Sequence, residues 1–165
     1  MKTRLTGSTH KKVIVELLDK TLVREYLNPA KLTAQAQPEI DLLTQHGSHE
    51  NVPLGKVRAV YFVRNLADDI DLERRSFLSR PKLDGLWVKL RFQDGDSLEG
   101  VIPNDLLSFL DHGIQITPPD FNSNTDRVYV PRGALTELTV LGVVGIARRK
   151  PVAAAEATQP RLFNE

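Results

Sequence analysis

The sequence predicts a mainly β protein of two tandem small five-stranded barrels from an internal duplication, with short helical turns and a partly helical connector. Two observations predict this fold. Residues 13–19 and 88–94 share one pattern of alternating apolar side chains, 75 positions apart, and such alternation is typical of half-buried strands. Five strands fit in each copy, which is too few for a large sandwich and enough to close a small barrel.

The repeat continues along both copies. After one inserted residue, Asn28 aligns with Asn104, and further on residues 52–57 align with residues 130–135. Few residues are identical, but the order, the spacing and the apolar positions agree. We interpret this agreement as a duplication.

The repeat divides the chain into five parts. They are a flexible N-terminal tail, a first barrel, a connector, a second barrel and a flexible C-terminal tail, at residues 1–11, 12–63, 64–85, 86–147 and 148–165. The connector carries five basic and five acidic residues, and we expect Asp69 to cap a short helix that runs through Arg75. We also expect the connector to pack across the two barrels.

The expected strands follow the alternation in each copy. In the first copy they are residues 13–17, 22–27, 40–43, 50–54 and 57–63, and in the second copy 88–92, 97–102, 114–117, 127–130 and 135–144. Asp94-Gly95 is a strong hairpin signal because the turn needs a positive φ, which Gly accepts at little cost. Asp19-Lys20 is its weaker counterpart.

A short helical turn is expected after the second strand of each copy. Asn28 is a suitable N-cap with Pro29 at the first helical position, and Asn104 caps a turn over residues 105–111 before Gly113 ends it.

Composition excludes several classes of protein. The chain has no Cys, which rules out a disulfide scaffold, a cysteine nucleophile and a thiolate metal site. Its apolar runs are far shorter than the roughly 18 residues that span a bilayer, and residues 1–12 lack the apolar core of a signal peptide. We expect a soluble cytoplasmic protein with no cofactor and no membrane partner.

Charge is distributed unevenly between the copies. The whole chain has a net charge of +1, which argues against a protein that coats polyanions over its whole surface. Residues 1–63 carry nine basic and six acidic residues, net +3, whereas residues 86–145 carry four and eight, net −4. The second barrel would therefore repel a phosphate backbone over most of its surface.

The second copy contains a recognisable series of short motifs. An alternating strand at residues 88–92 is followed by Gly95, by Gly100, and by Asn104-Asp105 before an apolar pair, and Arg132-Gly133 follows a later strand. This series resembles the two motifs of the Sm and Sm-like superfamily, which implies small SH3-like barrels. The chain also resembles uncharacterised bacterial proteins, which implies a bacterial source.

The first copy departs from these motifs. Lys20 replaces the turn glycine, Glu25 stands near the second glycine, and Leu54-Gly55 replaces Arg-Gly. The first copy therefore lacks the Arg that carries RNA binding in Sm proteins.

The Sm resemblance implies single-stranded RNA binding through Asn104, Asp105 and Arg132. An amide can read base edges and a guanidinium can stack on bases. Against this hypothesis, the second copy is acidic and the family's second Asn is absent. The structural alternative is that Asn104 caps a helical turn and that Arg132-Gly133 forms a turn.

Three arginines suggest a different ligand. Arg74, Arg75 and Arg80 precede the second barrel and resemble the arginine motif of PilZ-family cyclic-dinucleotide receptors. The resemblance implies binding of a cyclic dinucleotide, since guanidinium groups form paired hydrogen bonds with phosphate and with the guanine edge. Gly95 stands where that family's turn has an acid or amide, and the arginine spacing is one residue longer. The alternative is a solvated helix face that pairs with neighbouring acids.

The outward faces of the strands favour a protein-binding surface. Apolar side chains on these faces need a cover, and the candidates are Ile14, Leu18, Tyr61, Trp87 and Leu141. Packing of the barrels on each other and on the connector accounts for most of them, and Trp87 and Tyr61 would anchor a partner or a second copy.

The sequence shows no catalytic motif. Phosphate loops, nucleophile elbows and zinc-protease helices are absent, and we interpret His46-Gly47-Ser48-His49 as a turn rather than a metal site. The sequence therefore favours a non-enzymatic binding or assembly module, with RNA or cyclic-dinucleotide binding as alternatives.

Overall fold

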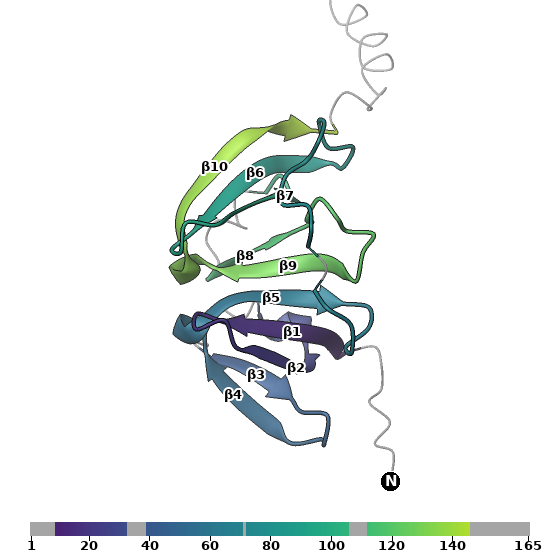
Figure 1. Ribbon diagram of the computed structural model, residues 1–165, viewed down its shortest axis with the longest axis vertical. Helices are drawn as coiled ribbons and strands as arrows, with labels where there is room; N and C mark the ends of the chain where they lie inside the picture. The colour runs from purple at the N-terminus through teal and green to yellow at the C-terminus, as the bar shows by residue number, and fades with distance from the viewer. Residues whose placement is uncertain (1–8, 33–38, 71, 106–111, 146–165) are drawn as a thin grey trace, which may run out of the picture.

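The computed structural model describes residues 9–32, 39–70, 72–105 and 112–145, and these residues form a mainly β protein (Figure 1). The first half contains β1 (Lys11–Leu17), β2 (Leu22–Leu27), β3 (Glu39–Leu43), β4 (His49–Pro53) and β5 (Val57–Val63). The second half contains β6 (Gly85–Phe92), β7 (Ser97–Ile102), β8 (Gly113–Ile116), β9 (Thr125–Pro131) and β10 (Leu135–Val144). Short 3-10 turns are η1 (Pro29–Lys31), η2 (Leu54–Lys56) and η4 (Arg132–Ala134).

The strands form two antiparallel sheets. A seven-stranded sheet has the order β4-β3-β2-β1-β5-β9-β8, and a three-stranded sheet has the order β10-β6-β7. An isolated bridge between Val101 and Thr117 connects the two sheets. Neither sheet closes on itself through a ladder of the described strands. The prediction of a mainly β, antiparallel protein is confirmed.

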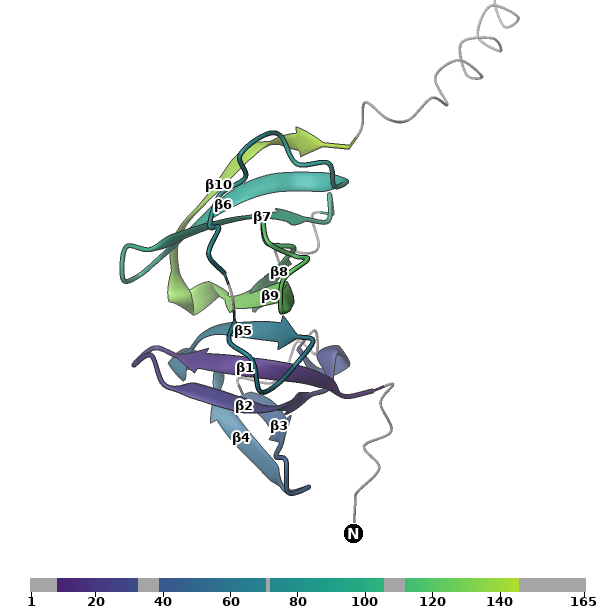
Figure 2. The ribbon, with the colours of Figure 1, turned by 45° about the vertical axis from the view of Figure 1, so that its right-hand side comes forward.

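The β5–β9 ladder was not anticipated from the sequence. It joins the last strand of the first half to the fourth strand of the second half, with Val60 opposite Tyr129 and Phe62 opposite Arg127. In two views of the molecule, β5 and β9 lie side by side at its middle, whereas β4 and β10 lie at opposite ends (Figures 1 and 2).

Local turn chemistry is as predicted. The Asn28 side chain accepts a hydrogen bond from the Ala30 amide and caps η1, with Pro29 at its first position. Gly95 has φ 91° and Lys20 has φ 73°, so the same turn position takes a positive φ in both hairpins, and Lys20 adopts it at a steric cost that Gly95 avoids. The helical turn predicted over residues 105–111 lies largely outside the described residues, as do most of the two predicted tails.

The connector is not helical, so the helix predicted from Asp69 to Arg75 is wrong. Residues 64–70 and 72–84 contain no helix. Their backbone groups bond to other segments instead, because the Arg74 amide donates to Asp120 Oδ2 at 3.0 Å and the Arg75 carbonyl accepts from the Glu99 amide at 2.8 Å. A helix would have to give up these bonds to the second half.

Two apolar cores fill the molecule. The smaller one lies within the first half and includes Val13 and Val15, whereas the larger one includes Ile14 and Tyr61 and extends into the second half. Strands β1 and β5 thus contribute one face to each core. The whole of β5 is buried, because it has a strand on both sides and a core on both faces.

Candidate functional site

Of the four outer strands in the described sheets, β7 and β8 are bridged to each other, whereas β4 and β10 present free edges. Among the described residues, β10 pairs with β6 alone and β4 with β3 alone. Three large apolar side chains on β10 are exposed, with fractions of 50% for Val140, 41% for Leu141 and 39% for Val143. A bulge after Val140 interrupts the pairing with β6. An exposed apolar strand edge is a surface on which another strand can add.

Strand β5 is the counterpart of β10 in the first half, and it is paired with β9 along the edge that is free in β10. Each of β5 and β10 follows a 3-10 turn, at residues 54–56 and 132–134, so positions in the two strands correspond with an offset of 78. Phe62 is 2% exposed and Val63 is 8% exposed, whereas Val140 and Leu141 at the corresponding positions are largely exposed. Strand β5 has β9 along this edge and an apolar core on each face, with Phe62 in one core and Val63 in the other.

The residues predicted to form an interaction surface separate into two groups. Leu18 and Leu141 are exposed. Ile14 and Tyr61 are buried in the larger core, so they are not part of a partner-binding surface, and the expected packing of the two halves on each other covers them. Their outward direction follows from strand alternation, but the β5–β9 ladder brings the second half over that face.

Trp87 is half-buried rather than free on a surface. Its indole Nε1 donates to Glu99 Oε1 at 2.8 Å, and its ring meets Phe77 edge to face with centroids 6.3 Å apart. Phe77 belongs to the connector, so Trp87 holds the connector against the second half.

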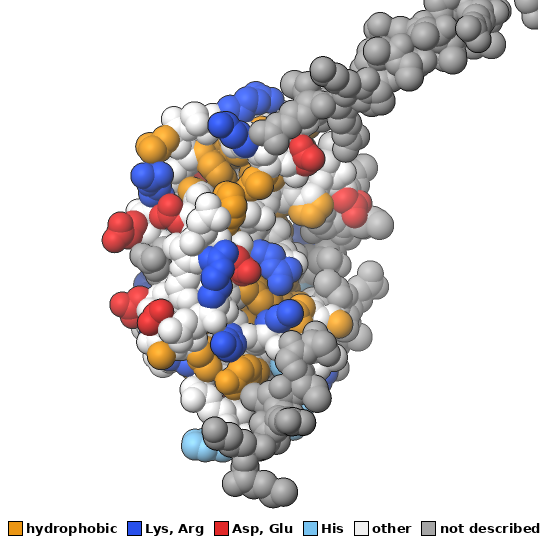
Figure 3. All heavy atoms as spheres, turned by 90° about the vertical axis from the view of Figure 1, so that its right-hand side faces the viewer, with side chains coloured by type: hydrophobic (Ala, Val, Ile, Leu, Met, Phe, Trp, Pro, Cys, Tyr) orange, Lys and Arg blue, Asp and Glu red, His pale blue; other side chains and the backbone are white. Residues whose placement is uncertain are grey.

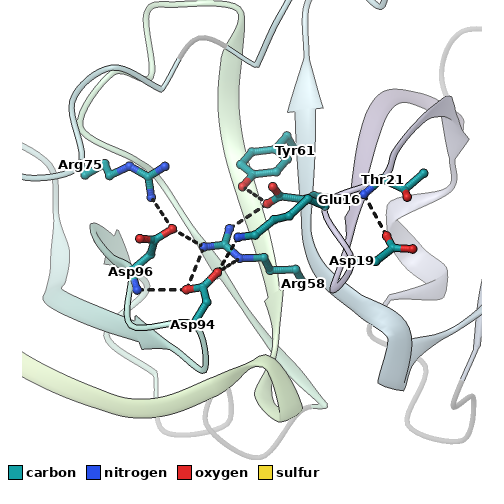
Figure 4. A network of polar contacts seen from close by, with 9 residues as sticks. Glu16, Asp19, Thr21, Arg58, Tyr61, Arg75, Asp94 and Asp96 are labelled. Atoms are coloured by element: carbon teal, nitrogen blue, oxygen red, sulfur yellow. Dashed lines mark hydrogen bonds and ion pairs between the residues drawn. The ribbon is translucent and has the colours of Figure 1, made fainter.

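A buried arginine joins the two halves (Figure 4). The Arg58 side chain is 5% exposed and donates to Glu16 at 2.7 Å, to Asp94 at 2.9 Å and to Asp96 at 3.1 Å. Tyr61 also donates to Glu16, at 3.0 Å. The two aspartates lie in the β6–β7 hairpin of the second half.

These contacts shift the pKa values of the network in opposite directions. Hydrogen bonds from Arg58 and Lys20 hold the pKa of Asp94 well below its usual value. Burial, with the charge of Glu16, raises the pKa of the Tyr61 hydroxyl. The Asp94 carboxylate therefore keeps its charge beside Arg58 at neutral pH, which suits a structural bridge between the halves.

A basic cavity of about 440 Å³ opens beside the junction. It is lined by the start of β1, by Tyr26, by the end of β5 and by the start of β9. Sequence reasoning missed this site. The pair Lys11-Lys12 was its one local signal, and the other basic residues come from segments that only the β5–β9 ladder brings together.

A second cavity lies along the connector. Arg74 and Arg80 line it together with Phe77 and Phe121. Arg75 does not line this cavity, and its Nη1 lies 3.8 Å from Asp96 Oδ2. The structure thus brings together two of the three arginines that the sequence singled out.

The residues of the RNA hypothesis lie in two places in the second half: Asn104 and Asp105 follow β7, and Arg132 begins the 3-10 turn η4. Asn104, Asp105 and Arg132 are all exposed. The Asp105 amide donates to the Pro103 carbonyl at 2.8 Å, and the Arg132 amide donates to the His112 carbonyl at 2.9 Å. RNA binding by these residues stays a prediction.

The turn predicted at His46-Gly47-Ser48-His49 is found slightly earlier in the chain, at residues 44–47, and His49 is already the first residue of β4. The Gly47 amide donates to the Thr44 carbonyl at 3.0 Å, and Gly47 has φ 88°. No group of three or more potential metal-ligating side chains occurs in the described parts of the chain. None of the helical segments described is long and apolar enough to cross a membrane.

Comparison with known proteins gives a family without an assigned role. Residues 9–142 match the family described as "Family of unknown function (DUF6982)". The chain belongs to this family. This DUF6982 chain is also 27% identical over 128 residues to a DNA ligase of Nitrosococcus oceani, an alignment that covers 70% of the chain and 18% of the ligase. The chain thus spans less than a fifth of that relative, and no solved structure matches it.

Proposed function

We propose that this DUF6982 chain is a non-enzymatic assembly module of the bacterial cytoplasm, built from two duplicated small β-barrels. In this proposal, copies associate head to tail by pairing β10 of one copy with β4 of the next. The order of elements supports the duplication, because both halves run strand, strand, a connecting segment, strand, strand, 3-10 turn and strand.

One observation carries the proposal. Within the molecule, the fifth strand of the first half pairs with the fourth strand of the second half. The fourth strand of the first half and the fifth strand of the second half are β4 and β10, each an outer strand of its sheet. The other two outer strands, β7 and β8, face each other through the bridge between Val101 and Thr117. A second copy would therefore extend the arrangement that already joins the halves.

The internal ladder also gives a register for the contact between copies. Applying the offset of 78 to the pairs Val60–Tyr129 and Phe62–Arg127 places Leu138 opposite Asn51 and Val140 opposite His49. Main-chain hydrogen bonds would supply most of the affinity, as in other cases of strand addition. The polar side chains of β4 limit the apolar burial and favour a reversible contact.

Charge complementarity supports the head-to-tail arrangement. The first half is basic, with net +3 over residues 1–63, and the second half is acidic, with net −4 over residues 86–145. Head-to-tail contact brings opposite charges together, whereas contact between two second halves brings acidic surfaces together. A head-to-tail contact is heterologous, so it generates closed rings or open filaments rather than a single symmetric dimer.

The test is the molar mass in solution. Light scattering of the wild-type chain should show a mass that rises above 18.5 kDa with protein concentration, and V140K should remain at the monomer mass. L22K is the matched control, because Leu22 is 44% exposed but lies on β2, away from both free edges. A wild-type chain that stays monomeric at all concentrations would overturn the proposal, as would equal effects of V140K and L22K.

A second candidate function is binding of a cyclic dinucleotide in the connector cavity. Arg74 and Arg80 line this cavity with two aromatic rings, and guanidinium groups and rings are suitable contacts for phosphates and bases. Titration with cyclic di-GMP should show saturable binding that R74A and R80A abolish. R75A should bind as the wild type does, because Arg75 does not line the cavity; loss of binding in R75A alone would contradict this site.

A further inference from the structure

We propose that the basic cavity at the junction of the halves binds a nucleoside polyphosphate. The cavity lies where the start of β1, the end of β5 and the start of β9 meet. The face of the molecule shown in Figure 3 carries a group of Lys and Arg side chains around a hydrophobic patch near its middle. Neither the family description nor the assembly proposal assigns a role to this cavity.

The charge of the cavity points to an anion. Lys11, Lys12, Arg64 and Arg127 line it, against a single carboxylate, Asp126. In the described part of the chain, none of these four cations lies within 4 Å of a carboxylate oxygen. Gathered like charges repel one another, and phosphate groups would relieve this repulsion with several charge-assisted hydrogen bonds.

Neutral groups hold three of these cations in place. The Lys12 ammonium donates to the Arg64 carbonyl at 3.3 Å, and the Arg64 guanidinium donates to the Phe121 carbonyl at 2.8 Å. The Arg127 guanidinium lies 4.9 Å from the centroid of the Phe62 ring. These contacts orient the side chains without neutralising their charge, so the positive potential of the cavity is kept for a ligand.

The remaining lining residues fit a base and a ribose. Tyr26 is half-buried and offers a ring on which a base can stack. The Asp126 carboxylate can accept a hydrogen bond from a ribose hydroxyl or an exocyclic amine. A volume of about 440 Å³ is within the range of about 300–1,000 Å³ typical of small-molecule sites, so the cavity can hold one nucleotide.

The surroundings favour a nucleotide over a nucleic-acid strand. A strand that continued from the cavity over the second half would meet a net charge of −4. That charge repels a phosphate backbone.

The experiment is calorimetric titration of the full chain with ATP, with inorganic tripolyphosphate and adenosine as partial ligands. We expect saturable ATP binding that K12Q and R64Q each weaken by about tenfold or more. Both residues are exposed, so these variants keep the fold. K56Q is the matched control, because Lys56 is an exposed lysine of the same half outside the cavity, and it should bind ATP as the wild type does.

The partial ligands test the phosphate-binding part and the base-binding part of the cavity separately. Tripolyphosphate should bind about tenfold more weakly than ATP, and Y26A should remove this advantage of ATP while Y26F keeps it. Absence of saturable ATP binding up to about 1 mM, or equal binding by K12Q, R64Q and the wild type, would overturn the proposal. Tripolyphosphate binding as tight as ATP, or tighter binding of a short RNA than of ATP, would also overturn it.

Discussion

The guanidinium carbon of Arg58 lies 4.0 Å from the centroid of the Phe92 ring, although the two residues belong to different halves of the chain. Arg58 is at the same time bonded to Asp94 and Asp96, which are in the hairpin that follows Phe92. The junction thus combines a backbone ladder, an apolar core and a buried cation. We expect the two halves to unfold together rather than one after the other.

Replacing Arg58 should destabilise the whole molecule. R58M removes the buried cation that Glu16, Asp94 and Asp96 share. Lys20 still contacts Asp94 and Arg75 still contacts Asp96, so we expect a loss of about 1–3 kcal/mol. Urea unfolding should show this loss in a single transition. In the triple variant R58M/D94N/D96N the loss should be clearly smaller, because the unpaired carboxylates are gone; an equal loss would show that the charges are not the cause.

Glu25 should make stability fall as the pH rises. Burial and the neighbouring Glu50 raise the pKa of Glu25 from 4.5 to about 7. Between these values the unfolded chain has released a proton that the folded chain still holds, so the free energy of unfolding decreases with pH in this window. The decrease should amount to at most about 3 kcal/mol and level off above the folded pKa.

The variant E25Q tests this pH dependence directly. Its free energy of unfolding, measured by urea titration from pH 4.5 to 8, should lack the decrease seen in the wild type and should exceed the wild-type value at pH 8. E39Q changes an exposed carboxylate of β3 and should keep the decrease. If E25Q and the wild type give parallel curves, Glu25 is not the group responsible.

Gly100 should resist substitution because its neighbour leaves no room. A Cβ at this position would lie 2.8 Å from two side-chain carbons of Ile116, where β7 packs near β8. G100A should therefore cost about 1–3 kcal/mol by overpacking, measured by denaturant unfolding. G55A is the control, since a Cβ there meets nothing within 4 Å, and it should change the stability by less than about 0.5 kcal/mol.

The single Trp of the chain reports on the connector. F77A removes the ring that meets Trp87, so the indole should become more solvated, its emission should shift to the red, and residues 64–84 should be cut faster by trypsin. L78A is the comparison, because Leu78 is 82% exposed and should change neither signal. A red shift of equal size in L78A would contradict the role given to Phe77.

The strands could be predicted from sequence because their signals are local. Alternating apolar residues and turn residues placed β2, β5, β7 and β10 at the observed bounds, and the cap at Asn28 needed only its own side chain and the next two residues. The connector helix failed for the opposite reason. Its charge pattern favours a helix, but Asp120 and Glu99, distant in the sequence, bind its backbone instead.

The candidate sites depended on pairings that leave no local trace. The alternation predicted correctly that Ile14 and Tyr61 face away from the first core, but the sequence does not show that β9 pairs with β5 and buries them. Arg58 meets partners 36 and 38 positions away in the sequence, so no spacing rule would single it out. The basic cavity was missed for the same reason.

Mixing two edge variants tests the central claim of head-to-tail assembly most directly. V140K blocks the β10 edge and N51K places a lysine on the exposed β4 edge, where lysine discourages strand addition. Each variant alone should have the monomer mass of about 18.5 kDa. An equimolar mixture should form heterodimers, because N51K keeps a functional β10 edge and V140K keeps a functional β4 edge. A mixture that stays monomeric while the wild type assembles, or N51K dimers in the absence of V140K, would contradict the head-to-tail contact.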